Sequence, residues 1–143
     1  FAGRCFDEEY YKEMQAFIAE QGCHGRIIFL GSIPYEELPY LYSTCKLFVF
    51  PSTCESFGMT LVEAMACGAP ILTSRLEPML EICADAAVYF NPMKPDEMAE
   101  VISKVLRDQQ LISALTKKSL ERIECFSWEN TAKKTLKIFE SLA

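Results

Sequence analysis

The feature that most constrains the fold is the nine-residue stretch from Glu55 to Glu63, in which two glutamates frame a Phe-Gly step. The apolar run Leu47–Phe50 comes just before it, and the run after Gly58 has the pattern of a helix that stops at Gly68. The stretch is therefore predicted to be the turn from a buried strand into a helix. In parallel α/β folds, such a turn at the carboxyl end of a strand is where ligands bind.

The rest of the chain alternates between strand-like and helix-like patterns with short connections. Short apolar runs predict strands at residues 26–30, 47–50, 69–73 and 86–90. Helical spacing or capping signals predict helices at residues 7–21, 34–42, 60–67, 95–107, 108–125 and 127–143, and a helical turn at 78–83. Ser127 is a suitable N-cap for the last of these helices.

Strands that alternate with helices indicate βαβ units and a parallel sheet. We therefore predict an α/β, Rossmann-like fold with helices on both faces of the sheet. The opening residues Phe1-Ala2-Gly3 look like the end of a strand already in progress, so we expect the fold to be truncated at its amino end.

Length and charge fit one domain over residues 1–143 that does not bind nucleic acid. The net charge is −6 and no long basic run is present, whereas non-specific nucleic-acid binding needs clustered Lys and Arg. No apolar stretch reaches the roughly 18 residues that a membrane span requires. We expect a cytoplasmic protein, with the full-length chain at the inner face of the membrane through peripheral association.

The seven cysteines point to no metal centre and no disulfide framework. Their number is odd, their spacings are wide and no C-x-x-C pair occurs. Reduced thiols, buried or partly buried, are the expected state in a cytoplasmic chain.

Four segments in order resemble a known enzyme family. They are Arg26–Gly31, Leu47–Ser52, Glu55–Pro70 and Phe126–Trp128. Over essentially the whole chain, they resemble the carboxyl-terminal, donor-binding domain of family-4 (group 1) retaining glycosyltransferases, half of a GT-B fold.

The resemblance implies a transferase of polysaccharide biosynthesis. Such enzymes move a hexose from a nucleotide-diphosphate sugar to an acceptor hydroxyl with retention of configuration, and need no metal or other cofactor. The acceptor, a carbohydrate or glycolipid, is bound mainly by an amino-terminal lobe. That lobe and the first βα unit, which normally brings an Arg and a Lys to the diphosphate, have no counterpart in this chain. Arg4 and Arg75 are the nearest replacements by loop position, and we expect this fragment alone to be inactive.

The resemblance also implies the site residues. Glu55 matches the catalytic glutamate near the donor sugar, and Glu63 the one that holds the ribose hydroxyls. Whether Glu55 acts as a nucleophile, stabilises charge or binds a sugar hydroxyl is left open. The full set of donor-binding positions is Gly31, Ile33, Ser52, Phe57, Gly58, Met59, Thr60 and Glu63.

Physical chemistry supports the same nonapeptide independently of the family. A helix start leaves about four amide N–H groups unpaired and carries about half a positive charge, which suits a diphosphate. Gly58 would let the backbone approach the ligand closely. With Thr60 first in the helix, Glu63 would lie on the same side one turn later.

Each assignment has a plainer alternative. Glu63 could cap its own helix through the spacing Thr60-x-x-Glu63. Glu55 could be a solvated loop residue, Gly58 could serve only the turn, and His24 is better explained as a surface residue. Two other functions stay open, a GT-B sugar-nucleotide epimerase and a non-catalytic module that binds a nucleotide-sugar or a partner.

Overall fold

The computed structural model describes residues 1–142, which form two compact units, Phe1–Leu38 and the chain from Pro39 onward. In the first unit, helix α1 spans Glu8–Glu20. The side chain of Asp7 caps it, since Asp7 Oδ1 accepts a hydrogen bond of 2.9 Å from the Tyr10 amide. This confirms the helix predicted at residues 7–21.

The strand predicted at residues 26–30 is wrong, because the structure has no strand there. The segment instead takes two backbone hydrogen bonds at Phe1, from Phe1 N to Ile28 O at 2.7 Å and from Leu30 N to Phe1 O at 2.8 Å. The rings of Phe1 and Phe29 stack with their centroids 5.4 Å apart. The next hydrogen bond runs from the Gly3 amide to the carbonyl of Gly31, which has a positive φ of 66°, so these contacts do not form a continuous ladder.

The helix predicted at residues 34–42 begins as a 3₁₀ turn, η1 (Tyr35–Glu37), and continues as α2 (Leu38–Thr44). Pro34 suits this start because it supplies no amide donor. Tyr42 is the buried residue of α2, and its ring stands edge-on to Phe48 with centroids 5.3 Å apart.

The second unit is built on a parallel sheet, as predicted, and its strands lie in the order β1-β2-β3. The strands span Phe48–Phe50 (β1), Ile71–Ser74 (β2) and Ala87–Phe90 (β3). Phe50 lies opposite Thr73, and Thr73 lies opposite Tyr89, so the carboxyl ends of all three strands lie at the same end of the sheet. The helices of this unit span Met59–Ala66 (α3), Glu77–Cys83 (α4), Pro95–Arg107 (α5), Gln109–Ile123 (α6) and Trp128–Leu142 (α7).

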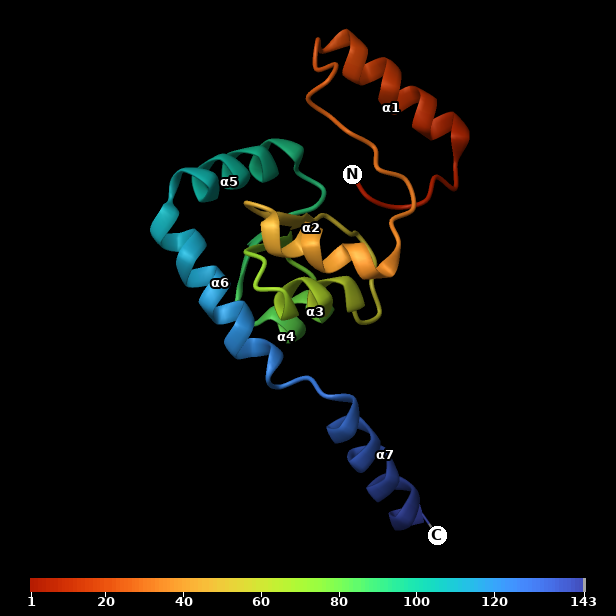
Figure 1. Ribbon diagram of the computed structural model, residues 1–143, viewed down its shortest axis with the longest axis vertical. Coiled ribbons are helices and arrows are strands. Elements are labelled where there is room, and N and C mark those ends of the chain that lie inside the picture. The colour runs from red at the N-terminus through yellow and green to blue at the C-terminus, as the bar shows by residue number, and fades with distance from the viewer. Residues whose placement is uncertain (143) are drawn as a thin grey trace. The chain divides into compact units, whose positions relative to one another are not determined.

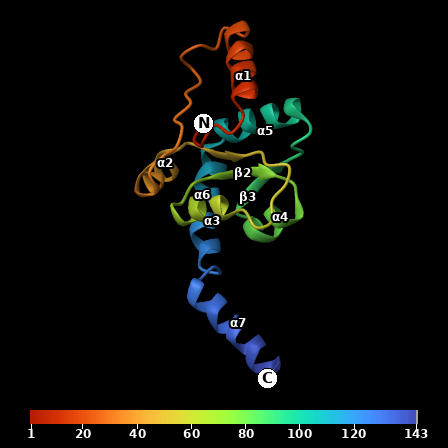
Figure 2. The ribbon, with the colours of Figure 1, turned by 90° about the vertical axis from the view of Figure 1, so that its right-hand side faces the viewer.

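Helices cover both faces of this sheet (Figures 1 and 2). Helix α3 connects β1 to β2, and α4 connects β2 to β3. Because both connections are right-handed and cross the sheet in the same direction, both helices lie on the same face. Figure 2 shows α5 on the opposite side of the strands, where it packs on β3. Helix α6 packs on α3, α5 and β2.

Burial differs between the strands. All four residues of β2 are fully buried, whereas all three residues of β1 are half-buried. Within residues 1–142, β1 pairs with β2 alone and is an edge strand, which explains why the strand predicted as buried is half-exposed.

Side chains cap two of the later helices. Asp108 Oδ1 accepts from the Leu111 amide at 2.9 Å, and Ser127 Oγ accepts from the Asn130 amide at 3.3 Å. The predicted N-cap at Ser127 is thereby confirmed. No helix within residues 1–142 is long and apolar enough to cross a membrane.

One buried hydroxyl ties α6 to the central strand. Ser119 is fully buried, and its Oγ donates to the carbonyl of Ala69, just before β2, at 2.9 Å. We expect Ser119→Ala to lower the free energy of unfolding by about 1–3 kcal/mol, because the Ala69 carbonyl loses its partner inside the core. Ser113→Ala is the matched control, since its exposed hydroxyl bonds within the same helix. Equal urea denaturation midpoints for the two variants would contradict this expectation.

Candidate functional site

The predicted turn from strand to helix is present at the carboxyl end of β1. Helix α3 begins at Met59, one residue earlier than predicted, and Gly58 is its N-cap with φ 83° and ψ 54°. The Leu61 amide donates to the Gly58 carbonyl at 2.9 Å, and no side chain caps this helix start. The first amide N–H groups of α3 therefore have no side-chain acceptor, and this arrangement favours the binding of an anion.

Gly58 is buried and meets two constraints. Its φ lies in the left-handed region, which residues with a Cβ adopt only at a cost in conformational energy. A Cβ added to Gly58 would also come within 3.3 Å of Leu61 Cδ1 and 4.0 Å of Ile82 Cδ1. The underside of the turn is thus packed by α3 and α4.

Glu63 is the fifth residue of α3 and half-buried. Its Oε2 accepts a long hydrogen bond of 3.4 Å from the hydroxyl of Tyr42, which comes from α2. The alternative in which Thr60 and Glu63 form a capping box is wrong, because Gly58 occupies the cap position and Thr60 lies inside the helix. The carboxylate is instead oriented toward the preceding helix.

Glu55 is half-buried in the loop between β1 and α3. Ser52 organises this loop, since its Oγ donates to the Cys54 carbonyl at 2.9 Å and accepts from the Cys54 amide at 3.4 Å. The hydroxyl of Ser52, which is predicted to bind the sugar donor, is therefore hydrogen-bonded to the backbone of Cys54, the residue before Glu55.

Three further predicted positions lie at the same turn. Phe57 and Met59 remain 42% and 44% exposed, which leaves both side chains accessible to a ligand, and Thr60 is half-buried. The ring of Phe57 stands edge-on to that of Phe126, with centroids 6.2 Å apart and planes at 77°. The structure thus gathers Ser52, Glu55, Phe57, Gly58, Met59, Thr60 and Glu63 along one strand-to-helix connection.

The other two donor-binding predictions, Gly31 and Ile33, belong to the first unit. Gly31 has a positive φ of 66°, and its carbonyl accepts from the Gly3 amide at 2.9 Å. Ile33 is half-buried. Arg4 lies in the same unit, with its guanidinium 5.8 Å from the centre of the Phe6 ring.

Arg75, the other predicted cation, directly follows β2. Since β1 and β2 end in register, Arg75 lies at the carboxyl end of the sheet, where the Glu55 loop also begins. Its guanidinium stands 5.8 Å over the ring of Tyr89 and stays exposed. A positive charge is therefore available at this end of the sheet.

Two contacts of the site, those of Tyr42 and Phe126, had no signal in the sequence. Helical spacing predicts only that Tyr42 ends a helix, and Phe126 belongs to a segment that carries the family resemblance. Neither pattern indicates which distant side chain each ring touches. The structure shows that Tyr42 contacts Glu63 and that Phe126 contacts Phe57.

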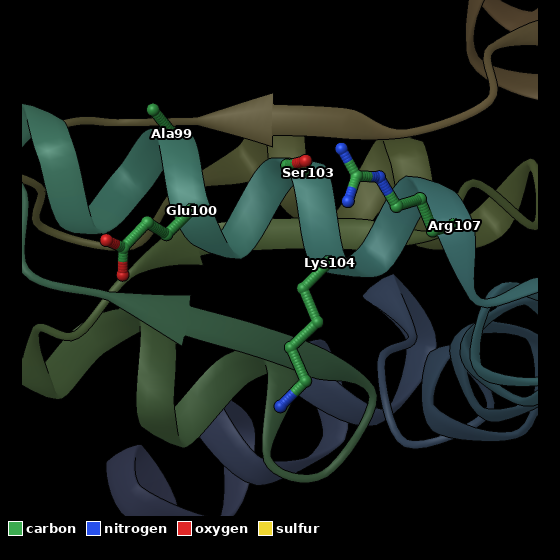
Figure 3. A pocket seen from close by; sticks show the side chains of 5 residues that line it. All are labelled: Ala99, Glu100, Ser103, Lys104 and Arg107. Atoms are coloured by element: carbon green, nitrogen blue, oxygen red, sulfur yellow. The ribbon is translucent and has the colours of Figure 1, made fainter.

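Two hollows on the surface are lined by residues outside this turn. One of about 560 Å³ is lined by Ala99, Glu100, Ser103, Lys104 and Arg107, all carried by α5 (Figure 3). Another, of about 360 Å³ in the first unit, includes the exposed His24, which agrees with the surface role predicted for this residue. No group of three His, Cys, Asp or Glu side chains suited to a metal occurs within residues 1–142.

A sequence model of the family described as "Glycosyl transferases group 1" matches residues 1–122. The chain belongs to this family. Among its relatives, the O-antigen chain mannosyltransferase B of Escherichia coli is 35% identical over 126 residues, 87% of this chain and 33% of that protein. The serotype-specific mannosyltransferase WbdA of Escherichia coli is 37% identical over 117 residues, 82% of this chain and 14% of that protein. This group 1 chain thus spans a third or less of the length of these relatives.

Solved structures of glycosyltransferases share the fold. Sucrose-phosphate synthase from Thermosynechococcus elongatus aligns with a TM-score of 0.82 at 28% identity, covering 92% of this chain and 34% of that one. Anabaena Alr3699/HepE in complex with UDP aligns with a TM-score of 0.88 at 25% identity, covering 98% and 40%. The predicted α/β fold, half of a GT-B architecture, is confirmed, and the relatives do not favour the epimerase alternative.

The cysteines of this group 1 domain are all free thiols, although three of them, Cys5, Cys54 and Cys125, are exposed, contrary to the expected burial. Cys83 is fully buried, and burial raises its pKa to about 11. Burial, followed by the charge of Glu63, also raises the pKa of Cys67.

We expect these differences to order the reaction of the thiols with iodoacetamide in the native protein at pH 8. Cys5, Cys54 and Cys125 should react first and Cys83 last, because only an accessible thiolate reacts. Peptide mass spectrometry over a time course measures this order, and urea-unfolded protein, in which all seven should react alike, is the control. Early labelling of Cys83 in the native protein would show that its burial is transient.

Proposed function

We propose that this chain is the carboxyl-terminal, donor-binding domain of a family-4 retaining glycosyltransferase that transfers a hexose from a nucleotide-diphosphate sugar to an acceptor hydroxyl. One observation carries the proposal: two half-buried glutamates, Glu55 and Glu63, flank the uncapped start of α3 at the carboxyl end of β1. A diphosphate at the helix start would then have a carboxylate on either side for the hydroxyls of its two sugars.

The roles follow from position. Glu55, on the loop, faces the hexose, while Glu63, one turn inside α3, accepts hydrogen bonds from the ribose hydroxyls. The amides at Gly58, Met59 and Thr60 bind the diphosphate, with Ser52 and Phe57 shaping the loop above it. The family resemblance, not their position, assigns Gly31 and Ile33 to the base. Arg75, at the same edge of the sheet, is a candidate to neutralise the phosphates, and no metal or other cofactor is required.

The comparisons support the donor class. The Escherichia coli relatives are named mannosyltransferases, which act on a hexose, and the Anabaena protein was solved in complex with UDP. We infer the same class of donor, with the base and hexose left unspecified. The acceptor is a carbohydrate or glycolipid bound by a part of the protein outside this domain, in the cytoplasm at the membrane face.

A non-catalytic module that binds a nucleotide-sugar would share the contacts of Glu63 and the start of α3. It would not need a charge at Glu55, where no nucleoside contact is expected. Turnover by the wild-type full-length protein therefore separates the enzyme from the module, and its response to a neutral side chain at Glu55 tests the role of that charge.

In the full-length protein, we expect Glu55→Gln to lower kcat by at least about 100-fold, the scale for loss of one electrostatic group in a transition state. Binding of UDP, GDP or ADP, whichever the wild type binds, should change by less than about twofold. Glu77→Gln, which neutralises an exposed glutamate in the first turn of α4, is the matched control. Turnover is measured as nucleoside diphosphate released from donor, and wild-type turnover in Glu55→Gln would make Glu55 a solvated loop residue without a catalytic role.

For Glu63→Ala, we expect nucleotide affinity to fall by about 1.5–3 kcal/mol, the range for hydrogen bonds to a charged group. Tyr42→Phe should give a smaller loss of the same kind, because it removes only the hydroxyl that orients Glu63. Tyr40→Phe, on the exposed side of the same helix, is the control and should leave affinity unchanged. Isothermal titration with the nucleoside diphosphate measures all three. Wild-type affinity in Glu63→Ala would remove the ribose role.

A further inference from the structure

Arg122, in the last turn of α6, is tied to the end of another helix. Its Nε donates to the Ile82 carbonyl at 2.8 Å and its Nη2 to the Glu81 carbonyl at 2.6 Å. Both carbonyls belong to the last turn of α4, where carbonyls have no partner within the helix. The planar guanidinium fork suits two such acceptors at once, which a lysine ammonium does not.

The same guanidinium also holds an aromatic ring. It stands 5.3 Å over the centre of the Phe126 ring, a cation–π distance. The Phe126 amide donates to the Ile123 carbonyl at 2.9 Å, so the ring is carried by the turn that follows α6. Phe126 is half-buried, and the edge-on contact already described joins it to Phe57.

The two attachments of Arg122 converge on one turn. Through the Ile82 backbone, Arg122 fixes the residue whose Cδ1 lies 4.0 Å from the Cβ position of Gly58. Through Phe126, it fixes the ring that packs on Phe57, the residue before Gly58. The guanidinium of Arg122 therefore supports both the ring that packs on Phe57 and the isoleucine that packs on Gly58.

We propose that Arg122 and Phe126 are positioning residues that hold the Phe57-Gly58 turn, and with it the start of α3, in the geometry that binds the donor diphosphate. This inference rests on the proposed function. Neither residue contacts the donor, and both act through Phe57 and Ile82. Glu55 is anchored separately by the Ser52–Cys54 hydrogen bonds, so loosening the turn weakens donor binding more than it slows the chemical step.

The test uses the full-length protein, with donor KM and kcat measured for Phe126→Leu, Phe126→Tyr and Arg122→Lys. Phe126→Leu and Arg122→Lys should raise donor KM by about three- to tenfold, the scale of one aromatic contact. In both variants, kcat should stay within about twofold of the wild type. Phe126→Tyr keeps the ring and should keep the wild-type KM.

Leu120→Ala is the matched control for a purely structural effect. Leu120 lies on α6 and covers Gly68 at the far end of α3, with Cδ2 3.5 Å from the Cβ position of that glycine. This variant should lower the melting temperature without raising donor KM. If Phe126→Leu and Arg122→Lys behave like Leu120→Ala, with a lower melting temperature and an unchanged KM, the proposal is overturned.

Hydrogen exchange separates this inference from the proposed function. Deuterium uptake over residues 56–62 should increase in Phe126→Leu and stay at the wild-type level in Leu120→Ala, with no ligand present. Unchanged uptake in Phe126→Leu would overturn the positioning role. If uptake increases but wild-type protein binds none of UDP, GDP and ADP, the proposed function fails while the support of the turn stands.

Discussion

The left-handed backbone at Gly58 is the constraint on which the site depends. It allows the chain to leave β1, pass through the Glu55 loop and enter α3 without a side chain at the cap. A residue with a Cβ would meet both an unfavourable φ and the side chain of Leu61 at this point. The loop on one side of Gly58 and the helix on the other bring Glu55 and Glu63 to opposite ends of a single turn.

The elements around Gly58 set how firmly that turn is held. The buried strand β2 aligns the ends of β1 and β3, so the loops of this edge have a common base. Tyr42 approaches Glu63 from α2, while α4 and the segment after α6 approach Phe57 and Gly58. The proposed donor site is therefore a short backbone segment supported by residues from three other elements.

Local signals in the sequence predicted the helices well. Pro95, Asp108 and Ser127 each mark a helix start, and helices form there because capping and proline effects act within a few residues. The strand expected at residues 26–30 failed because a strand exists only through its partner, and within residues 1–142 only Phe1 pairs with that segment. The pattern of apolar residues cannot report whether a partner is present.

The site shows the same division between local and distant information. The two glutamates and the glycine could be predicted because strand, turn and helix adjoin in the sequence. A capping role for Glu63 requires Thr60 at the cap, and the observed cap lies two residues earlier, at Gly58. The contacts of Tyr42 and Phe126 join residues far apart in the chain, and no local pattern encodes such a meeting.

The family match ends at residue 122, in the last turn of α6, whereas the aromatic contact to Phe57 comes from Phe126. Domain limits drawn at the end of the family match would therefore cut between a guanidinium and the ring that it covers. A domain that keeps this contact has to extend beyond the family match, at least to Phe126. A chimaera joined directly after Arg122 would inherit the nonapeptide of one parent and the aromatic support of the other.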